Sequence, residues 1–390
     1  MSLDVLLRPE KIAIVGDARE KTTYKMFIKI VERTTGFPKV KIVDLGGEIN
    51  GAEKSVKYLG RDIDICVVVL GGKSLGKHLQ EIFKRCKLVV LLSDISEQIL
   101  ENREKILGPR SAGIINNDVG LRTSISEIPP AGSVSLISQK QAVTVRILRK
   151  MSAYSVGVSK VICTGEGQGI PEIDILKVLA SDKSTSTICL NIYRTKNLRN
   201  LLDEIGHVSR SKPVVFHFLG KDDWMVASAV RQRGGIYVRN VRELVCGAKI
   251  LSETPPLLGD RIFLLARTVD LCLDAAKHLS EFTICDVPEK ILVKAGLEKG
   301  NTGCCFKNID LLVRYIPEFE KVSDGIFLVL EEDEEIEKLE GIRVNKTFVV
   351  IYPRRIRSAR FPIFEDVEDA ALAMKISAER GKFLRKSKIC

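Results

Sequence analysis

The chain has 390 residues, of which 45% are hydrophobic and 28% charged; this is the composition of a soluble globular protein long enough for two or three domains. Lys and Arg number 61 against 50 Asp and Glu, but the basic residues are spread out and only 6% of residues are aromatic, so a nucleic-acid-binding protein is not predicted. No run approaches the roughly 18 apolar residues of a membrane helix, and the opening MSLDVLLRPE does not read as a secretory signal, so we expect a cytoplasmic protein without membrane contact.

The cysteines indicate a reducing compartment. There are 10 of them, scattered and without the C-x-x-C spacing of zinc or redox sites. Cys66, Cys163 and Cys189 lie inside apolar runs typical of strands. We therefore predict buried free thiols and no bound metal.

Apolar, β-branched runs alternate with helical patterns along the whole chain, which indicates βαβ units and parallel sheets. Proline-rich linkers at Pro129-Pro130 and Pro255-Pro256 predict three domains, covering residues 1–128, 129–255 and 256–390. The predicted strands are, in chain order, Ile12–Val15, Val40–Val43, Ile65–Leu70, Leu88–Leu92, Val134–Ile137, Val161–Cys163, Thr187–Ile192, Val214–Phe218, Ile236–Val238, Ile262–Ala266, Phe282–Val287, Gly325–Leu330 and Thr347–Tyr352.

One strand, loop and helix suggests an anion site. The run Lys160–Cys163 leads through Gly165, Gly167 and Gly169 to a helix opened by Pro171-Glu172. Such a turn aims backbone N–H groups and the positive end of the helix dipole at one point, which suits a phosphate or carboxylate. A plain βα turn with no ligand is the other interpretation.

Three charged segments are expected to have no special role. The basic segments Arg354–Arg360 and Arg380–Lys388 are interpreted as a solvated loop and a frayed C-terminus, and the acidic run Glu331–Glu337 as a solvated loop.

The glycine loop lies within a longer family pattern. Before it comes GSVSLISQKQAVTVRILRKMSAYSVGVSK (132–160) and after it SDKSTSTICLNIYRTKNLRNLLDEIGHVSRSKPVVFHF (181–218). Together these resemble the NDP-forming acyl-CoA synthetases, the family of ADP-forming acetate–CoA ligase and succinyl-CoA synthetase. The resemblance continues in KIAIVGDARE (11–20), IDICVVVLGG (63–72), KILGPRSAGIINNDVGLRTSI (105–125) and ARFPIFEDVEDAALAMKIS (359–377).

The resemblance implies an α/β fold with a Rossmann-like coenzyme A domain followed by two flavodoxin-like domains. It also implies coenzyme A or acyl-CoA as the ligand and an ATP-grasp, β-type partner subunit in an oligomer. The residues matching the coenzyme A positions are Gly16, Asp17, Ala18, Arg19, Lys21, Val69, Leu70, Gly71, Ser93, Gly108 and Pro109. Those matching the phosphate station are Ser138, Gln139, Gly165, Glu166 and Gly167.

The family's phosphate carrier has no counterpart here. In the family, a histidine in an S-H-T-G-S-type loop after a K-P-V strand ferries the phosphoryl group. Here the strand Pro213–Phe218 is followed by the short loop Leu219–Met225, which contains no histidine. His217 is the nearest substitute, but it belongs to the strand, so a structural role is expected. His78, His207 and His278 also lack a mobile, glycine-flanked setting.

Other positions that bind phosphate in the family also carry different residues in this chain. The S-Q-S-G motif reads Ser138-Gln139-Lys140-Gln141, and a Cβ in place of its glycine crowds a backbone that must approach an oxyanion. Where the family has a G-G-P-G-type turn, this chain has Arg267–Asp270. The family's N-P-V-D segment is hardly recognisable in Gly300–Asn308. Asp17 adds a negative charge at the turn that receives coenzyme A phosphates, which Arg19 and Lys21 could offset.

Three hypotheses follow from these differences. The first is a non-catalytic, regulatory relative of the coenzyme A-binding subunit, in effect a pseudoenzyme. The second is an active ADP-forming acyl-CoA ligase subunit that works with an ATP-grasp partner. The third is an interaction protein whose domains bind no ligand; coenzyme A binding and an empty scaffold remain equally open.

Overall fold

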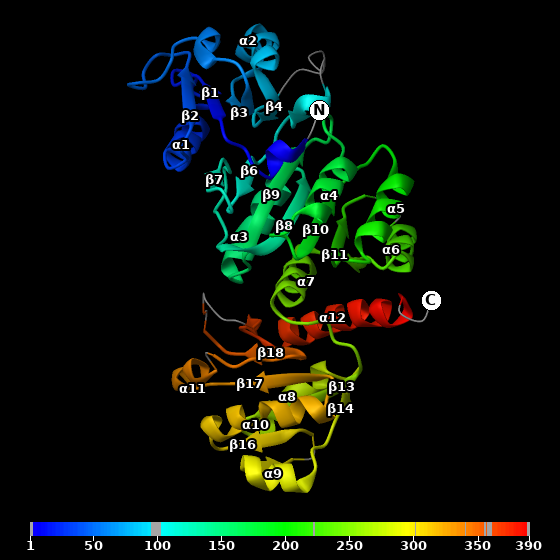
Figure 1. Ribbon diagram of the computed structural model, residues 1–390. Coiled ribbons are helices and arrows are strands. Elements are labelled where there is room, and N and C mark those ends of the chain that lie inside the picture. Colours follow the sequence, from blue (N-terminus) through cyan, green and yellow to red (C-terminus); the bar gives the residue numbers. More distant parts are fainter. Residues whose placement is uncertain are drawn as a thin grey trace. The chain divides into compact units, whose positions relative to one another are not determined.

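The computed structural model is described for residues 3–94, 103–220, 223–300, 302–339, 341–354, 356 and 361–387. The chain forms two compact units, Met1–Val241 and Arg242–Cys390. The strands form three mostly parallel sheets with helices between them (Figure 1), which confirms the predicted fold class. Each predicted strand contributes to one of these sheets.

The first sheet is entirely parallel and has the strand order β2-β1-β3-β4-β5. Its strands β1 and β3 are buried at every position, as expected for a sheet covered on both faces. Its elements are η1 (Leu3–Leu6), β1 (Ile12–Gly16), α1 (Tyr24–Thr34), β2 (Val40–Asp44), η2 (Val56–Leu59), β3 (Ile63–Val69), α2 (Gly72–Arg85), β4 (Cys86–Leu91), η3 (Arg103–Lys105) and β5 (Ile106–Leu107).

The second sheet has the order β12-β11-β10-β8-β9-β6-β7. Two of its strands, β6 and β7, were not predicted, and β6 runs antiparallel to β9 and to β7. Its elements are β6 (Ile114–Asn116), β7 (Leu121–Arg122), β8 (Ala131–Gln139), α3 (Gln141–Ala153), β9 (Val158–Gly165), α4 (Glu172–Ser181), β10 (Thr187–Ile192), α5 (Leu198–Val208), β11 (Val214–Phe218), α6 (Asp223–Gln232) and β12 (Ile236–Val238).

The third sheet, in the second unit, has the order β15-β16-β13-β17-β18-β19, with β14 paired to β13. Its short strands β15, β16 and β19 were missed because two or three residues carry too little periodicity. The elements are α7 (Val241–Glu253), β13 (Arg261–Ala266), α8 (Val269–His278), β14 (Thr283–Ile284), α9 (Glu289–Ala295), β15 (Leu297–Lys299), β16 (Cys304–Phe306), α10 (Ile309–Val322), β17 (Gly325–Val329), α11 (Asp333–Lys338), β18 (Thr347–Ile351), β19 (Ile363–Phe364) and α12 (Val367–Ser387).

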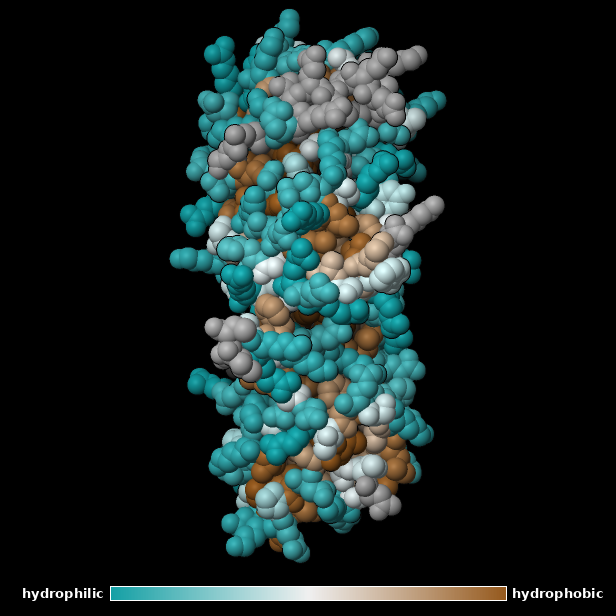
Figure 2. All heavy atoms as spheres, turned by 90° about the vertical axis from the view of Figure 1, so that its right-hand side faces the viewer, coloured by the Kyte–Doolittle hydropathy of each residue, from teal (hydrophilic) through white to brown (hydrophobic). Residues whose placement is uncertain are grey.

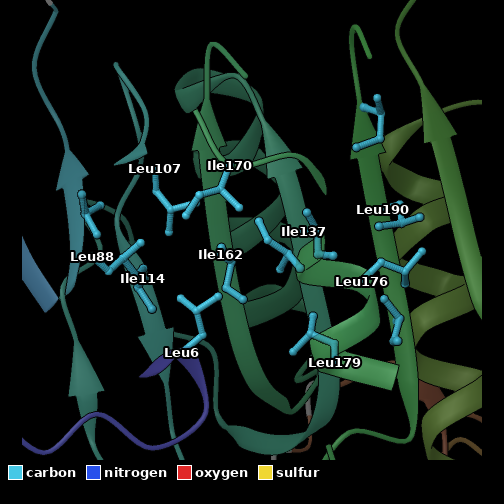
Figure 3. Packing of buried hydrophobic residues seen from close by; sticks show 14 of the residues in the cluster. Leu6, Leu88, Leu107, Ile114, Ile137, Ile162, Ile170, Leu176, Leu179 and Leu190 are labelled. Carbon is cyan, nitrogen blue, oxygen red and sulfur yellow. The ribbon is translucent and has the colours of Figure 1, made fainter. Parts of the chain in front are cut away.

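The predicted boundary at residue 128 does not coincide with a break between sheets. Strands β6 and β7 precede it but pair with the second sheet, and the first two sheets share one apolar core. Figure 3 shows this core. Leu88 and Leu107 of the first sheet lie near Ile114 at the left of the view, and Ile162 and Ile137 of the second sheet lie nearer its centre. The division into three domains at residues 128 and 255 stays a prediction.

Two predictions about charged segments are wrong. The acidic run Glu331–Glu337 contains helix α11, whose start is stabilised by a capping box between Glu332 and Glu335. The basic tail belongs to α12, which continues to Ser387 and buries Arg380 at 3% exposure. Part of the segment Arg354–Arg360 lies outside the described residues.

The described cysteines are free, and all of them except Cys285 are buried, as expected. Burial raises the pKa of the Cys304 thiol to about 11, which makes its thiolate scarce at neutral pH. Hydrophilic side chains cover most of the face seen in Figure 2, and apolar residues show between them. Within the described ranges, none of the helices has the length and apolar character needed to cross a bilayer.

The buried side chain of Lys160 links several polar residues at the amino edge of the second sheet. Lys160 on β9 is 1% exposed, and its Nζ lies 2.6 Å from Asp118 Oδ2 and 2.7 Å from Asp182 Oδ2. The ammonium group also donates to Ser184 Oγ at 2.7 Å. These three partners satisfy a charge that would otherwise be costly to bury.

Replacing Lys160 with Met is expected to destabilise the first unit by about 3 kcal/mol, near the lower end for breaking a buried ion pair, because Asp118 is 38% exposed and keeps some water. Urea unfolding monitored by circular dichroism measures the change. Lys177→Met on the exposed face of α4 is the matched control, and an equal effect of both substitutions would contradict the assignment.

Candidate functional site

The predicted coenzyme A residues lie along the carboxyl edge of the first sheet, where ligands of doubly wound sheets bind. Val69 and Leu70 are buried, so their side chains are not accessible to a ligand. The remaining positions lie at or just after the strand ends. Gly16 is the last residue of β1, and the others are Asp17, Ala18, Arg19 and Lys21 after β1, Gly71 after β3, Ser93 after β4, and Gly108 and Pro109 after β5.

A carboxylate of the chain itself holds the first of these turns. Asp44, at the end of β2, is fully buried and accepts from the backbone N–H of Ala18 at 2.9 Å. It also accepts from the amides of Gly46, Glu48 and Ile49, at 2.7–3.0 Å. Burial by itself would raise the pKa of Asp44, but these four hydrogen bonds hold it below the usual value. The amide of Ala18, one of the predicted coenzyme A residues, is therefore already engaged.

A second carboxylate occupies the turn after β3. Glu20 Oε2 accepts from the backbone N–H of Gly71 at 2.8 Å and from Thr23 Oγ1 at 3.1 Å. A Cβ at position 71 would lie 1.8 Å from Glu20 Oε1, so a larger residue would require the Glu20 side chain to move. Glu20 thus places a negative charge beside the N-terminus of α2, where an anionic ligand would otherwise be favoured.

Arg19, one of the two cations expected to offset the charge of Asp17, is exposed. Arg19 Nε donates to Glu48 Oε1 at 2.7 Å, and the hydrogen bond with Glu48 raises the pKa of Arg19. Lys21 is also exposed. Both side chains can reach a ligand, but Arg19 must leave Glu48 to do so.

The structure brings two separately predicted motifs into contact. Pro109 O accepts from the backbone N–H of Glu166 at 2.9 Å, which joins the loop after β5 to the glycine loop after β9. Gly165 has a φ of +59°, and a Cβ there would lie 2.0 Å from Pro109 O. The glycine is therefore required both by backbone conformation and by close approach.

The predicted phosphate station is filled by two side chains. Gln139, 2% exposed, donates from Nε2 to Glu172 Oε1 at 2.5 Å and to Arg194 O at 2.6 Å. Its Oε1 accepts from the amides of Tyr193 and Arg194. All its polar atoms are thus occupied, and Gly167 lies directly beside it.

Glu172 is the residue that sequence reasoning missed, because it was interpreted only as a helix start. It is 5% exposed at the N-terminus of α4 and accepts from Thr164 Oγ1 at 3.2 Å. Burial raises its pKa, and the hydrogen bonds from Gln139, its own backbone N–H and Thr164 act in the opposite direction. A carboxyl group thus lies where a phosphate was predicted.

The residues that replace the family's S-G pair also close the site. Lys140, not a glycine, has the positive φ of 66°, and its Nζ is paired with Glu166. Gln141 Nε2 donates to Leu92 O at 3.2 Å and to Ser111 O at 2.7 Å. The Gln141 side chain therefore bonds the backbone just after β4 and between β5 and β6, which a glycine could not do.

Ser138 lies deeper, in a buried hydrogen-bonded chain. Its Oγ accepts from Thr144 Oγ1 at 2.8 Å and from Asn191 Nδ2 at 2.9 Å. Asn191 Oδ1 is in turn 2.8 Å from Nδ1 of His217, which is 3% exposed. His217 is thus held inside β11, in agreement with the structural role expected for it.

The carboxyl edge of the third sheet is closed as well. Arg267, in the turn that replaces G-G-P-G, is paired with Glu335 and Glu332 of the α11 segment. Thr268 caps α8 by accepting from the backbone N–H of Leu271 at 3.4 Å. Among the described residues, no group of three or more His, Cys, Asp or Glu side chains is arranged to hold a metal ion.

Comparison with known proteins places these features in a family context. A family model described as "Succinyl-CoA ligase like flavodoxin domain" matches residues 131–222. The ADP-forming acetate–CoA ligase of Methanocaldococcus jannaschii is 28% identical over 318 residues, which are 70% of this chain and 45% of that protein. Subunit alpha of the Pyrococcus furiosus ADP-forming acetate–CoA ligase II is 23% identical over 365 residues, which are 84% of this chain and 76% of that subunit. The chain thus spans less than half the length of the first of these relatives.

Solved structures share the fold over nearly the whole chain. A Pyrococcus horikoshii protein superimposes with a TM-score of 0.85 at 19% identity, covering 98% of this chain and 100% of that one. The dinucleotide-forming acetyl-coenzyme A synthetase 1 of Candidatus Korarchaeum cryptofilum, in complex with phosphate and ADP, superimposes with a TM-score of 0.81 at 16% identity, covering 99% of both chains.

The close approach at Gly165 is open to a direct test. Gly165→Ala is expected to lower the free energy of unfolding by at least about 3 kcal/mol, because the left-handed backbone penalty adds to a clash with Pro109 O. Gly120→Ala is the control: its φ of +73° is similar but no atom lies within 4 Å of the added Cβ, so only about 1 kcal/mol is expected. Chemical denaturation of both variants measures the difference, and equal losses would contradict the assigned contact.

Proposed function

Because the chain is a relative of the ADP-forming acetate–CoA ligases, we propose that it is an α-subunit-like protein that keeps their scaffold without their phosphoryl relay. The observation that carries this proposal is the Gln139–Glu172 pair, buried at the glycine loop. A phosphate bound there would need the space of the Glu172 carboxyl group and would meet its negative charge whenever that group is ionised.

The histidines support the same proposal. A phosphate carrier must move between two stations, whereas His217 is fixed in a strand by Asn191. The other three histidines lie on helices: His78 on α2, His207 in the last turn of α5 and His278 in the last turn of α8. None of these positions provides a mobile loop for the imidazole.

We propose further that the first sheet binds coenzyme A or acyl-CoA at the turn Gly16–Lys21, and that the protein regulates or scaffolds a partner. The relatives are named as acetate–CoA ligases, and one of them as a subunit alpha, which favours an ATP-grasp, β-type partner. The exposed cations Arg19 and Lys21 supply the charge that a phosphate requires.

A protein without any ligand is the second candidate. Glu20 on the Gly71 amide and Asp44 on the Ala18 amide favour it, because each takes a donor that a phosphate would use. An active ligase subunit would require a route for the phosphoryl group that avoids both Glu172 and a fixed His217.

Incubation with acetyl-CoA and inorganic phosphate, or with ATP and a candidate β-type subunit, is expected to leave the protein free of covalent phosphate. Intact-mass spectrometry gives the measurement, and an active ligase of the family treated in parallel is the positive control. Stoichiometric phosphorylation that disappears in His217→Ala would overturn the proposal and support an active ligase subunit.

Isothermal titration calorimetry with coenzyme A separates the two candidates. Saturable binding that Arg19→Ala weakens several-fold is expected, because the variant removes a cation from the turn without touching the core. Lys177→Ala is the matched control. Absence of heat in the wild type, with the protein folded by circular dichroism, favours the ligand-free interaction protein.

A further inference from the structure

The chain's single tryptophan lies on the surface. Trp224, the second residue of α6, is 74% exposed, and the neighbouring Met225 is 50% exposed. Isolated exposed apolar residues are common, but large ones that gather at one place mark an interaction surface.

Trp224 and a second large exposed residue, Tyr193, both lie at the carboxyl edge of the second sheet. Strands β10 and β11 are parallel neighbours with Ile192 opposite Phe218, and Leu219 donates to Ile192 O at 2.8 Å. Tyr193, 45% exposed, directly follows β10. The helices that continue from the two strands, α5 and α6, pack together (Figure 1), so Tyr193 and Trp224 lie at the same edge.

Positive charge surrounds the Tyr193 side of this edge. Arg194, Lys196 and Arg199 are exposed, none of them forms an ion pair within the described parts of the chain, and residues 193–202 contain no carboxylate. The N-terminus of α5, at Leu198, adds the positive end of its dipole. The sequence places Asp222 and Asp223 directly before Trp224.

We propose that this patch, formed by Tyr193, Arg194, Lys196, Arg199, Trp224 and Met225, docks an acidic peptide segment of a partner protein. An apolar side chain of the peptide packs against Trp224 and Met225, and its carboxylates face the three cations. Trp, Tyr, Arg and Met are the residues most enriched where proteins bind one another. The proposal is independent of whether coenzyme A binds to the first sheet.

Single-stranded nucleic acid fits the patch less well. Stacking requires open aromatic faces, and Lys140 Nζ lies 4.6 Å from the centroid of the Tyr193 ring and covers one of them. Met225 offers an apolar surface but no aromatic plane. An acidic peptide uses the apolar surface and the cations together.

The only tryptophan is also the probe. Titration with a short synthetic peptide of alternating Glu and Leu is expected to shift the Trp224 emission to shorter wavelength in a saturable way that weakens with added salt. A peptide of alternating Lys and Leu has the same apolar content and the opposite charge, and a thymidine oligonucleotide has the charge without the apolar side chains. Neither is expected to produce the shift.

Two variants assign the effect to the patch. The double substitution Arg194→Glu with Lys196→Glu is expected to weaken binding of the Glu–Leu peptide at least about tenfold. Trp224→Ala is expected to weaken it similarly, with binding followed by the fluorescence anisotropy of a labelled peptide. Lys177→Glu with Lys183→Glu changes the net charge equally at exposed sites elsewhere and should leave binding unchanged. No shift with the acidic peptide, an equal shift with the Lys–Leu peptide, or a shift with the oligonucleotide alone would overturn the proposal.

Discussion

At the carboxyl edges of the first two sheets, carboxyl groups of the same chain accept hydrogen bonds, from backbone amides in the first sheet and from side chains in the second. Asp44 takes the Ala18 amide, Glu20 takes the Gly71 amide, and Glu172 lies at the start of α4. Turns from parallel strands to helices collect unpaired N–H groups, which need an acceptor. In this protein the acceptors are built into the chain, so these turns are stable without a bound anion.

One consequence is that buried hydrogen bonds hold the glycine loop in a single conformation. Gln139 makes four hydrogen bonds and Glu172 is almost completely buried, so the glycine loop is held from inside. Gln141, at the start of α3, bonds the backbone at Leu92, which follows β4, and at Ser111, between β5 and β6. Such a connected network of buried hydrogen bonds adds rigidity to the start of α4 and to the loop before it.

Different parts of the second sheet carry different polar groups. At its amino edge, the buried ammonium group of Lys160 is paired with Asp118 and Asp182. At its carboxyl edge, Tyr193 and Trp224 remain exposed beside three cations without ion-pair partners in the described chain. The proposed docking patch thus lies beside the Gln139–Glu172 pair, at the starts of α5 and α6.

The sequence alone determined the α/β class, the order of the long strands and the place of the glycine loop, because apolar β-branched runs and glycines act locally. It did not reveal strands such as β7, which has two residues, nor helix α11, whose acidic residues form a capping box and pair with Arg267. Only the tertiary structure decided what fills the candidate site. Glu20 and Gly71 are 51 residues apart and Gln139 and Glu172 are 33 apart, so their contacts depend on how the strands pair and not on any local pattern.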